Sequence, residues 1–170
     1  MTSQSANQKP IVVIDLETTG LGWDSRVLCI SVSEYGEGGL IVSRSLNTGM
    51  SDLFTTPCTV PEARAFVQEA IAGARWVAGH NLSFDLPFLV RDGLLDPAQL
   101  TGRVFDTLVM ARCTGSHSAC GLEDLCNEYA IPFNSPQEEL EYTKMKKARA
   151  HLSSKDPGSV MRYCELDTER

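Results

Sequence analysis

The sequence has no segment suited to crossing a membrane and few features of a secreted protein. No apolar run approaches the roughly 20 residues that a bilayer-spanning helix needs. Residues 1–9 are polar and lack the apolar stretch of a secretory signal, so we expect a flexible tail before a single domain at 10–170. The six cysteines include no Cys-x-x-Cys pair, which favours reduced, buried thiols in a cytoplasmic protein.

An excess of positive charge is also missing. The chain has 15 basic and 22 acidic side chains and a net charge of −7, which argues against a protein that holds long duplexes by charge alone. The net charge does not exclude a local acidic site, because clustered carboxylates raise the acidic count and bound cations would offset their charge. Six basic residues in the C-terminal stretch form either a solvated helix face or a phosphate-facing rim: Lys144, Lys146, Lys147, Arg149, Lys155 and Arg162.

A cluster of cysteine and histidine residues raises the question of zinc. Cys113, His117, Cys120 and Cys126 could in principle surround one ion. Structural zinc sites usually have more tightly paired ligands, however. The segment is therefore better interpreted as a loop followed by a helix.

Hydrophobic spacing and turn residues predict alternating strands and helices. The expected strands are 10–16, 27–34, 39–45, 75–79 and 103–106. The expected helices are 61–74, 83–91, 106–112, 121–130 and one that begins after Asp156, with Asp156 as its N-cap. This order predicts an α/β domain with a mixed sheet, in which carboxylates at the ends of the central strands share one crevice.

The first acidic pair interrupts an apolar strand. Asp15 and Glu17 lie at positions i and i+2, so both side chains leave the same face. Two carboxylates this close on a buried strand are costly unless a cation or proton compensates them. The pattern indicates a metal site, although a carboxylate that caps a nearby helix would give the same residues.

The second acidic position follows another strand. In GHNLSFD, residues 79–85, a strand ends at glycine and polar groups follow at the start of a helix. Asp85 lies near the helix N-terminus, where the helix dipole alone would favour a carboxylate. Asn81 could donate to a phosphate or a base, whereas His80 could simply pack.

The third acidic position lies near the end of the chain. Tyr163 and Asp167 are four residues apart, so on a helix their hydroxyl and carboxylate share a face. A phenol beside a carboxylate can orient a water molecule, but a core tyrosine beside a solvated aspartate is the simpler alternative. Arg170 ends the chain three residues later, so we expect a terminal turn that frays.

Together the segments DLETTG (15–20), GHNLSFDLPFL (79–89) and YCELD (163–167) resemble the three motifs of the DEDD, or DnaQ-like, 3′-5′ exonuclease superfamily. The last resembles the tyrosine-type motif, Y-x3-D. The segments VFDTLVMAR (104–112) and GLEDLCNEYAIP (121–132) resemble connecting parts of the family, so the likeness covers nearly the whole chain. It implies a ribonuclease-H-like fold with a five-stranded mixed sheet, order 3-2-1-4-5, strand 2 antiparallel, flanked by helices.

The resemblance also implies a mechanism with two Mg²⁺ or Mn²⁺ ions. Asp15, Glu17 and Asp167 would hold the first ion, and Asp15 would bridge to a second that Asp85 supports. Tyr163 would orient the attacking water. The expected activity is release of nucleoside 5′-monophosphates from the 3′ end of single-stranded nucleic acid, with DNA favoured over RNA.

Further expectations concern the substrate, partners and alternatives. Expected substrate contacts are Thr18, Thr19, Gly20, His80, Asn81 and Phe84, and Asp106 is interpreted as a helix cap or as a residue that supports the metal ligands. A polymerase or another replication or repair protein is a candidate partner, and the oligomeric state is open. Two alternatives remain: a histidine-type last motif made by His151 and Asp156, and a catalytically weak nucleic-acid-binding or scaffolding module of the same fold.

Overall fold

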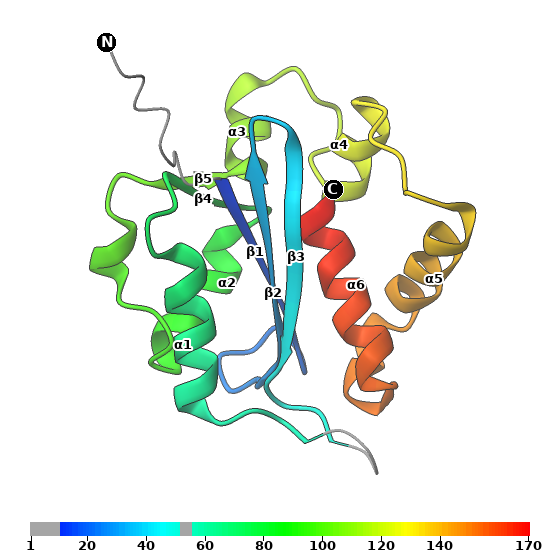
Figure 1. Ribbon diagram of the computed structural model, residues 1–170. Coiled ribbons are helices and arrows are strands. Elements are labelled where there is room, and N and C mark those ends of the chain that lie inside the picture. The colour runs from blue at the N-terminus through cyan, green and yellow to red at the C-terminus, as the bar shows by residue number, and fades with distance from the viewer. Residues whose placement is uncertain (1–10, 52–55) are drawn as a thin grey trace.

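The computed structural model describes residues 11–51 and 56–170, which form a five-stranded sheet flanked by helices (Figure 1). The strand order is β3-β2-β1-β4-β5. Strand β2 is antiparallel to both β1 and β3, whereas β4 is parallel to β1 and β5 is parallel to β4. The predicted order and the antiparallel second strand are therefore confirmed. The strands are β1 (Ile11–Thr18), β2 (Val27–Gly36), β3 (Gly39–Asn47), β4 (Trp76–Gly79) and β5 (Val104–Asp106). The expected tail at 1–9 lies outside the described residues.

Helices cover both faces of this sheet. Helices α1 and α2 lie on one face, while α6 lies on the other with α5 packed outside it (Figure 1). The helices are α1 (Val60–Ile71), α2 (Leu82–Arg91), α3 (Thr107–Thr114), α4 (Leu122–Glu128), α5 (Pro136–Lys147) and α6 (Pro157–Glu169), with short 3-10 helices η1 (Pro97–Leu100) and η2 (Arg149–Ser154). Among the described residues, none of these helices has the length and apolar character that a membrane span requires.

Two expectations about helices need correction. The first helix was expected to extend to residue 74, but α1 ends at Ile71. Helix α5 was not predicted because Tyr142 is its only buried residue, so its sequence lacks the apolar stripe that marks a packed helix. Local signals for α5 do exist, since Ser135 caps it and Pro136 occupies its first turn.

The alternation of side chains along β1 directs its carboxylates to the α6 side. Val12, Ile14 and Leu16 belong to the core that includes buried residues of α1 and α2. Side chains at odd positions leave the opposite face of the pleat. Asp15 and Glu17 therefore face α6, and the Asp15 carboxylate accepts a hydrogen bond from the Cys164 thiol of that helix.

A seam of hydroxyl groups fastens the last turn of α6 to the sheet. The Thr168 hydroxyl shares hydrogen bonds with Ser31 at 3.1 Å and Ser33 at 2.7 Å, and all three residues are buried. The Tyr35 hydroxyl donates to the Thr168 carbonyl at 3.0 Å. The turn that carries Asp167 is therefore anchored by direct contacts with β2, contrary to the expectation of a fraying end.

This seam makes a testable contribution to stability. Thr168→Val keeps the side-chain shape but leaves the Ser31 and Ser33 hydroxyls short of a buried partner, so we expect a loss of about 1–3 kcal/mol in the free energy of unfolding. Urea denaturation measures it as a lower midpoint with an unchanged slope. Thr101→Val, at an exposed position, is the matched control. Equal midpoints for the two variants would show that the seam does not anchor α6.

Candidate active site

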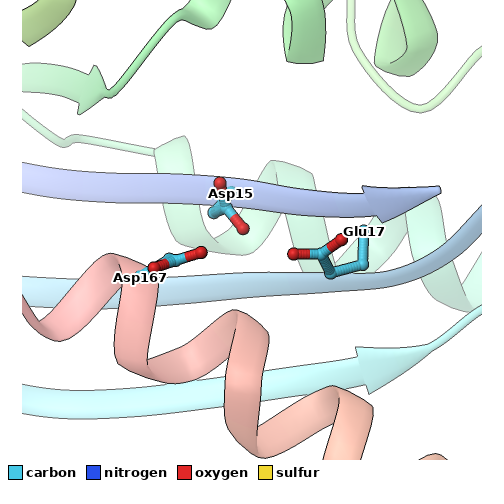
Figure 2. A group of neighbouring side chains, drawn as sticks. All are labelled: Asp15, Glu17 and Asp167. Atoms are coloured by element: carbon cyan, nitrogen blue, oxygen red, sulfur yellow. The ribbon is translucent and has the colours of Figure 1, made fainter. Parts of the chain in front are cut away.

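Three of the predicted carboxylates meet between β1 and α6. Asp15 and Glu17 project from β1 toward Asp167 on α6 (Figure 2). Each residue offers one carboxylate oxygen, and these oxygens all lie within 4.8 Å of one another. Glu17 is only 4% exposed, and the other two are partly buried. The structure thus brings together residues from the first and the last sequence motif in a single group.

Asp85 adjoins this group from the first turn of α2. The parallel pairing of β1 with β4 ends at Val13 and Ala78. Beyond that point, Asp85 Oδ1 accepts a hydrogen bond from the Leu16 N–H of β1 at 3.2 Å. The carboxylate therefore satisfies a backbone donor of β1 where the strand pairing has stopped, which fixes its position beside the other three.

A close approach at the end of β4 supports this arrangement. A Cβ atom added at Gly79 would lie 2.7 Å from the Ile14 carbonyl oxygen and 2.5 Å from Leu82 Cδ2. Glycine is therefore required where β4 passes β1 and the chain turns into α2. The glycine of the second motif thereby sets the distance between the strand that carries Asp15 and the helix that carries Asp85.

Burial favours the protonated forms of all four carboxylates, and repulsion by the others adds to this effect at Asp15 and Glu17. Burial, followed by the charges of Asp85, Asp167 and Glu17, raises the pKa of Asp15 well above its usual value. Burial together with Asp167 raises the pKa of Glu17 to about 8. Burial also raises the pKa of Asp85 to about 7 and that of Asp167 to about 6. Such a group is costly as four anions and is relieved by a cation.

The donor set fits a hard divalent cation. The three clustered residues offer only carboxylate oxygens, the ligands that Mg²⁺ and Mn²⁺ prefer. The alternative zinc cluster does not assemble, because among the described residues the only group with metal-site geometry is Asp15, Glu17 and Asp167. Of the proposed zinc ligands, His117 instead hydrogen-bonds Glu128 Oε2 through Nδ1 at 2.8 Å.

Two tyrosines flank Asp167. Tyr163, the predicted one, is buried and lines a cavity together with Asp15 and Asp167. Tyr142 of α5, which sequence reasoning missed, donates its hydroxyl to Asp167 Oδ1 at 2.7 Å. The two rings pack with centroids 5.0 Å apart. The hydroxyl in direct contact with the carboxylate therefore comes from α5, a helix that the hydrophobic pattern did not reveal.

The cavity beside the carboxylates has a volume of about 450 Å³ and mixed charge. Asp15, Glu123, Asp124 and Asp167 contribute acidic groups, while Arg112, Lys146 and Arg149 contribute cations. Its remaining lining residues include His80, Asn81, Tyr142 and Tyr163. Arg149 makes no direct ion pair with a carboxylate among the described residues. Arg149 is therefore placed to meet an anion that enters the cavity, whereas Lys146 pairs with Glu123.

The predicted substrate contacts divide into two groups. His80 and Asn81 line the cavity, and His80 Nδ1 shares a hydrogen bond with the Thr107 hydroxyl at 3.0 Å. Asn81 adopts a left-handed conformation with φ of 70°, and its N–H donates to Asp106 Oδ1 at 3.0 Å. The others do not line this cavity: Thr18, Thr19, Gly20 and Phe84.

The predicted substrate contacts outside the cavity hydrogen-bond or pack against residues close to them in sequence. Thr18 Oγ1 donates to the Gly20 carbonyl at 2.7 Å, and Thr19 Oγ1 accepts from the Arg26 N–H at 3.0 Å. The Phe84 ring packs against Phe88 with centroids 5.0 Å apart. In this structure, therefore, these side chains shape the ends of β1 and α2.

The two predicted caps are confirmed. Asp106 accepts from the N–H groups of Leu108 and Val109 at the start of α3. Asp156 accepts from the Ser159 N–H at 2.8 Å at the start of α6. His151 and Asp156 are both exposed and do not line the cavity of the carboxylates. The geometry therefore favours Tyr163 and Asp167 over this pair as the last motif.

Only some of the basic residues of the C-terminal stretch lie at the cavity. Lys146 and Arg149 line the cavity, which supports the interpretation as a rim. Arg162 instead pairs with Glu138 and Glu169, both at 2.7 Å. The rim is thus limited to the residues around the end of α5 and the start of η2.

Comparisons with known proteins agree with this geometry. A family model described as 3′-5′ exonuclease matches residues 2–170. Escherichia coli exonuclease I in complex with a dT13 oligonucleotide matches with a TM-score of 0.57 and 14% identity, over 87% of this chain and 43% of that one. An exonuclease I–SSB C-terminus complex matches with a TM-score of 0.53 and 16% identity, over 87% and 44%. Exonuclease X bound to duplex DNA with a 5′ overhang matches with a TM-score of 0.48 and 20% identity, over 74% and 76%.

These structural likenesses concern the fold. The chain spans less than half the length of the exonuclease I chains. A search of curated proteins found no significant match.

The raised pKa values predict how stability depends on pH and metal. Glu17 and Asp85 bind protons more tightly in the folded state than in the unfolded state. Their protonation therefore contributes fully to the free energy of unfolding below about pH 4, and this contribution is lost as pH rises toward 7–8. Mn²⁺ compensates the ionised carboxylates, so we expect it to raise the Tm more at about pH 8 than at about pH 6. Thermal denaturation in EDTA and in Mn²⁺ measures both effects.

Glu17→Gln supplies the control for this prediction. It removes a buried charge, so the metal-free Tm at about pH 8 should rise by several degrees and the Mn²⁺-dependent increase should shrink. A metal-free Tm that is lower than that of the unchanged protein would contradict the destabilising effect of this buried charge.

Proposed function

This chain belongs to the 3′-5′ exonuclease family of the DEDD superfamily, and on that premise we propose that it shortens single-stranded nucleic acid from the 3′ end, with DNA favoured over RNA. The products are nucleoside 5′-monophosphates. The observation that carries the proposal is the meeting of Asp15, Glu17 and Asp167 in one oxygen-only group. Residues that are distant in sequence converge there at a cost that a bound cation would relieve, which supports the proposal.

The proposed roles of the carboxylates follow their positions. Asp15, Glu17 and Asp167 would hold one divalent cation, and Asp85, together with Asp15, would hold a second. Bound Mg²⁺ or Mn²⁺ supplies Lewis-acid chemistry, by lowering the pKa of the attacking water and stabilising the leaving 3′ oxygen. The family implies dependence on a divalent metal, and the donor set supports these two ions.

The side chains around the cavity act on the nucleotide and the water. Tyr163 lines the cavity beside Asp167, where its hydroxyl can hydrogen-bond the attacking water. Arg149 and Lys146 supply cations for a phosphate opposite the carboxylates. Although burial lowers it, the pKa of Arg149 is raised on balance by Glu17, Tyr163 and Asp167, which keeps the guanidinium charged. Asn81, held by Asp106, is placed to donate to a base or a phosphate.

The substrate class rests on size and charge. A cavity of about 450 Å³ suits one or two nucleotide units better than a duplex. The net charge of −7 leaves few cations for holding an extended duplex. Exonuclease I, which shares the fold, was solved with an oligothymidine and with an SSB C-terminus. These structures support DNA as the substrate and a replication or repair protein as a partner.

The decisive test is an exonuclease assay on 5′-labelled single-stranded DNA and RNA of the same sequence. We expect a ladder of shortened DNA in Mg²⁺ or Mn²⁺, slower shortening of RNA, and no shortening in EDTA. Asp15→Asn should reduce the rate by roughly 10³-fold or more, because the cation ligand is lost. The matched control Asp96→Asn keeps a competent cap on η1 and should retain the rate. Tight strand binding without metal-dependent shortening would favour the scaffolding alternative.

A second test distinguishes the two forms of the last motif. Tyr163→Phe should lower kcat by roughly 10²-fold, because the attacking water loses an oriented hydrogen bond. His151→Gln, at an exposed position away from the cavity, should retain kcat. Single-turnover rates on labelled DNA provide the measurement. The reverse pattern would assign the motif to His151 and Asp156.

A further inference from the structure

Tyr142 is the one buried residue of α5, and its surroundings differ from those of an ordinary core tyrosine. The residue is 4% exposed. Its ring lies between Phe133 and Tyr163, with centroids 5.1 and 5.0 Å away. Its hydroxyl donates to Asp167 Oδ1 at 2.7 Å, a short bond to a carboxylate that we assign to the metal site. The ring is thus fixed by packing while the hydroxyl engages a proposed ligand.

The two tyrosines, whose rings are tilted by 42° relative to each other, make different contacts. Among the described residues, the Tyr163 hydroxyl makes no hydrogen bond, and it remains available to the cavity. The Tyr142 hydroxyl is committed to Asp167. A carboxylate has several lone pairs, so an oxygen that accepts this bond still leaves acceptor positions for a cation.

Helix α5 is itself held against α6, which makes this contact specific. Arg162 of α6 pairs with Glu138 of α5 at 2.7 Å. Ser135 caps the helix by accepting from the Glu138 N–H, so the residue that makes this ion pair also lies at the fixed end of α5. Tyr142 is one helical turn further along, on the same side.

We propose that Tyr142 is a positioning residue that orients Asp167 for cation binding, a role distinct from the one proposed above for the Tyr163 hydroxyl, which is to orient the attacking water. This inference rests on the proposed metal site and goes beyond it by assigning α5 a part in metal affinity. A partner that orients a metal ligand typically changes affinity by 10- to 100-fold when it is removed. Tyr142 therefore controls how tightly the ion is held, and Tyr163 acts on the bound water.

The test compares two variants that each lose one hydroxyl and keep the ring. Mn²⁺ binding is measured by electron paramagnetic resonance without nucleic acid, so activity is not the only readout. Tyr142→Phe should weaken Mn²⁺ binding about 10-fold, whereas Tyr163→Phe should leave it close to the unchanged protein. In the exonuclease assay, the rate of Tyr142→Phe should rise toward the unchanged protein's rate as Mn²⁺ saturates. The rate of Tyr163→Phe should stay low at every Mn²⁺ concentration.

A double-mutant cycle tests whether Tyr142 acts through Asp167. In an Asp167→Ala background, Tyr142→Phe should cause no further loss of Mn²⁺ binding, because the group that it orients is gone. Independent, additive losses would overturn the inference, and so would unaltered binding in Tyr142→Phe alone. If the unchanged protein itself binds no Mn²⁺, the proposed metal site is wrong. If it binds Mn²⁺ and Tyr142→Phe binds equally well, only the inference about Tyr142 is wrong.

Discussion

The burial of Asp15, Glu17, Asp85 and Asp167 beside one another is the constraint on which the rest of the structure depends. Four carboxylates in a largely buried space oppose folding unless protons or cations neutralise them. The raised pKa values of all four express this cost directly. A fold that retains such a group must hold each member by contacts that do not depend on the others, and each of them has such a contact or position. Asp15 and Glu17 are fixed by the pleat of the central strand, Asp85 by the Leu16 N–H, and Asp167 by Tyr142 and the seam around Thr168.

The contacts that hold the four carboxylates depend on different features: strand alternation, strand pairing and the docking of a helix. The β1 pair requires only alternation along a strand, which places the side chains of positions i and i+2 on the same face. Asp85 requires that β4 stop early and that Gly79 allow a close approach to Ile14. Asp167 requires a helix docked on the far side of the sheet, where Ser31 and Ser33 replace the apolar side chains expected at buried strand positions. Buried hydroxyls that are fully paired fix the register of a helix more specifically than apolar packing does, since a shift would leave them unsatisfied.

Periodicity and turn residues predicted the strands and most of the helices, because these are local signals. The strand order and the convergence of the first and last motifs could be predicted only because the three motifs resemble those of the DEDD superfamily. Asp106 and Asp156 were predicted as caps from local signals, since each precedes the helix that it caps. The contribution of α5 could not be predicted. Its sequence is polar around the helix, and its one buried residue contacts Asp167, which lies 25 positions away. The prediction that the turn carrying Asp167 frays was wrong because Thr168 hydrogen-bonds Ser31 and Ser33, which are distant in sequence. No pattern within α6 itself indicates these partners on β2.

The same electrostatics suggest an order of binding. Without cations, each carboxylate that stays ionised repels a phosphate, and the nearby cations of Arg149 and Lys146 offset this repulsion only in part. Lys146 is also paired with Glu123, which reduces its free charge further. Cations held by the carboxylates would reverse the charge on this side of the cavity while Arg149 remained opposite. An anion would then lie between two positive groups. Metal and nucleic acid should therefore bind with positive coupling, and residues that orient the carboxylates would affect substrate affinity through the metal rather than by contact.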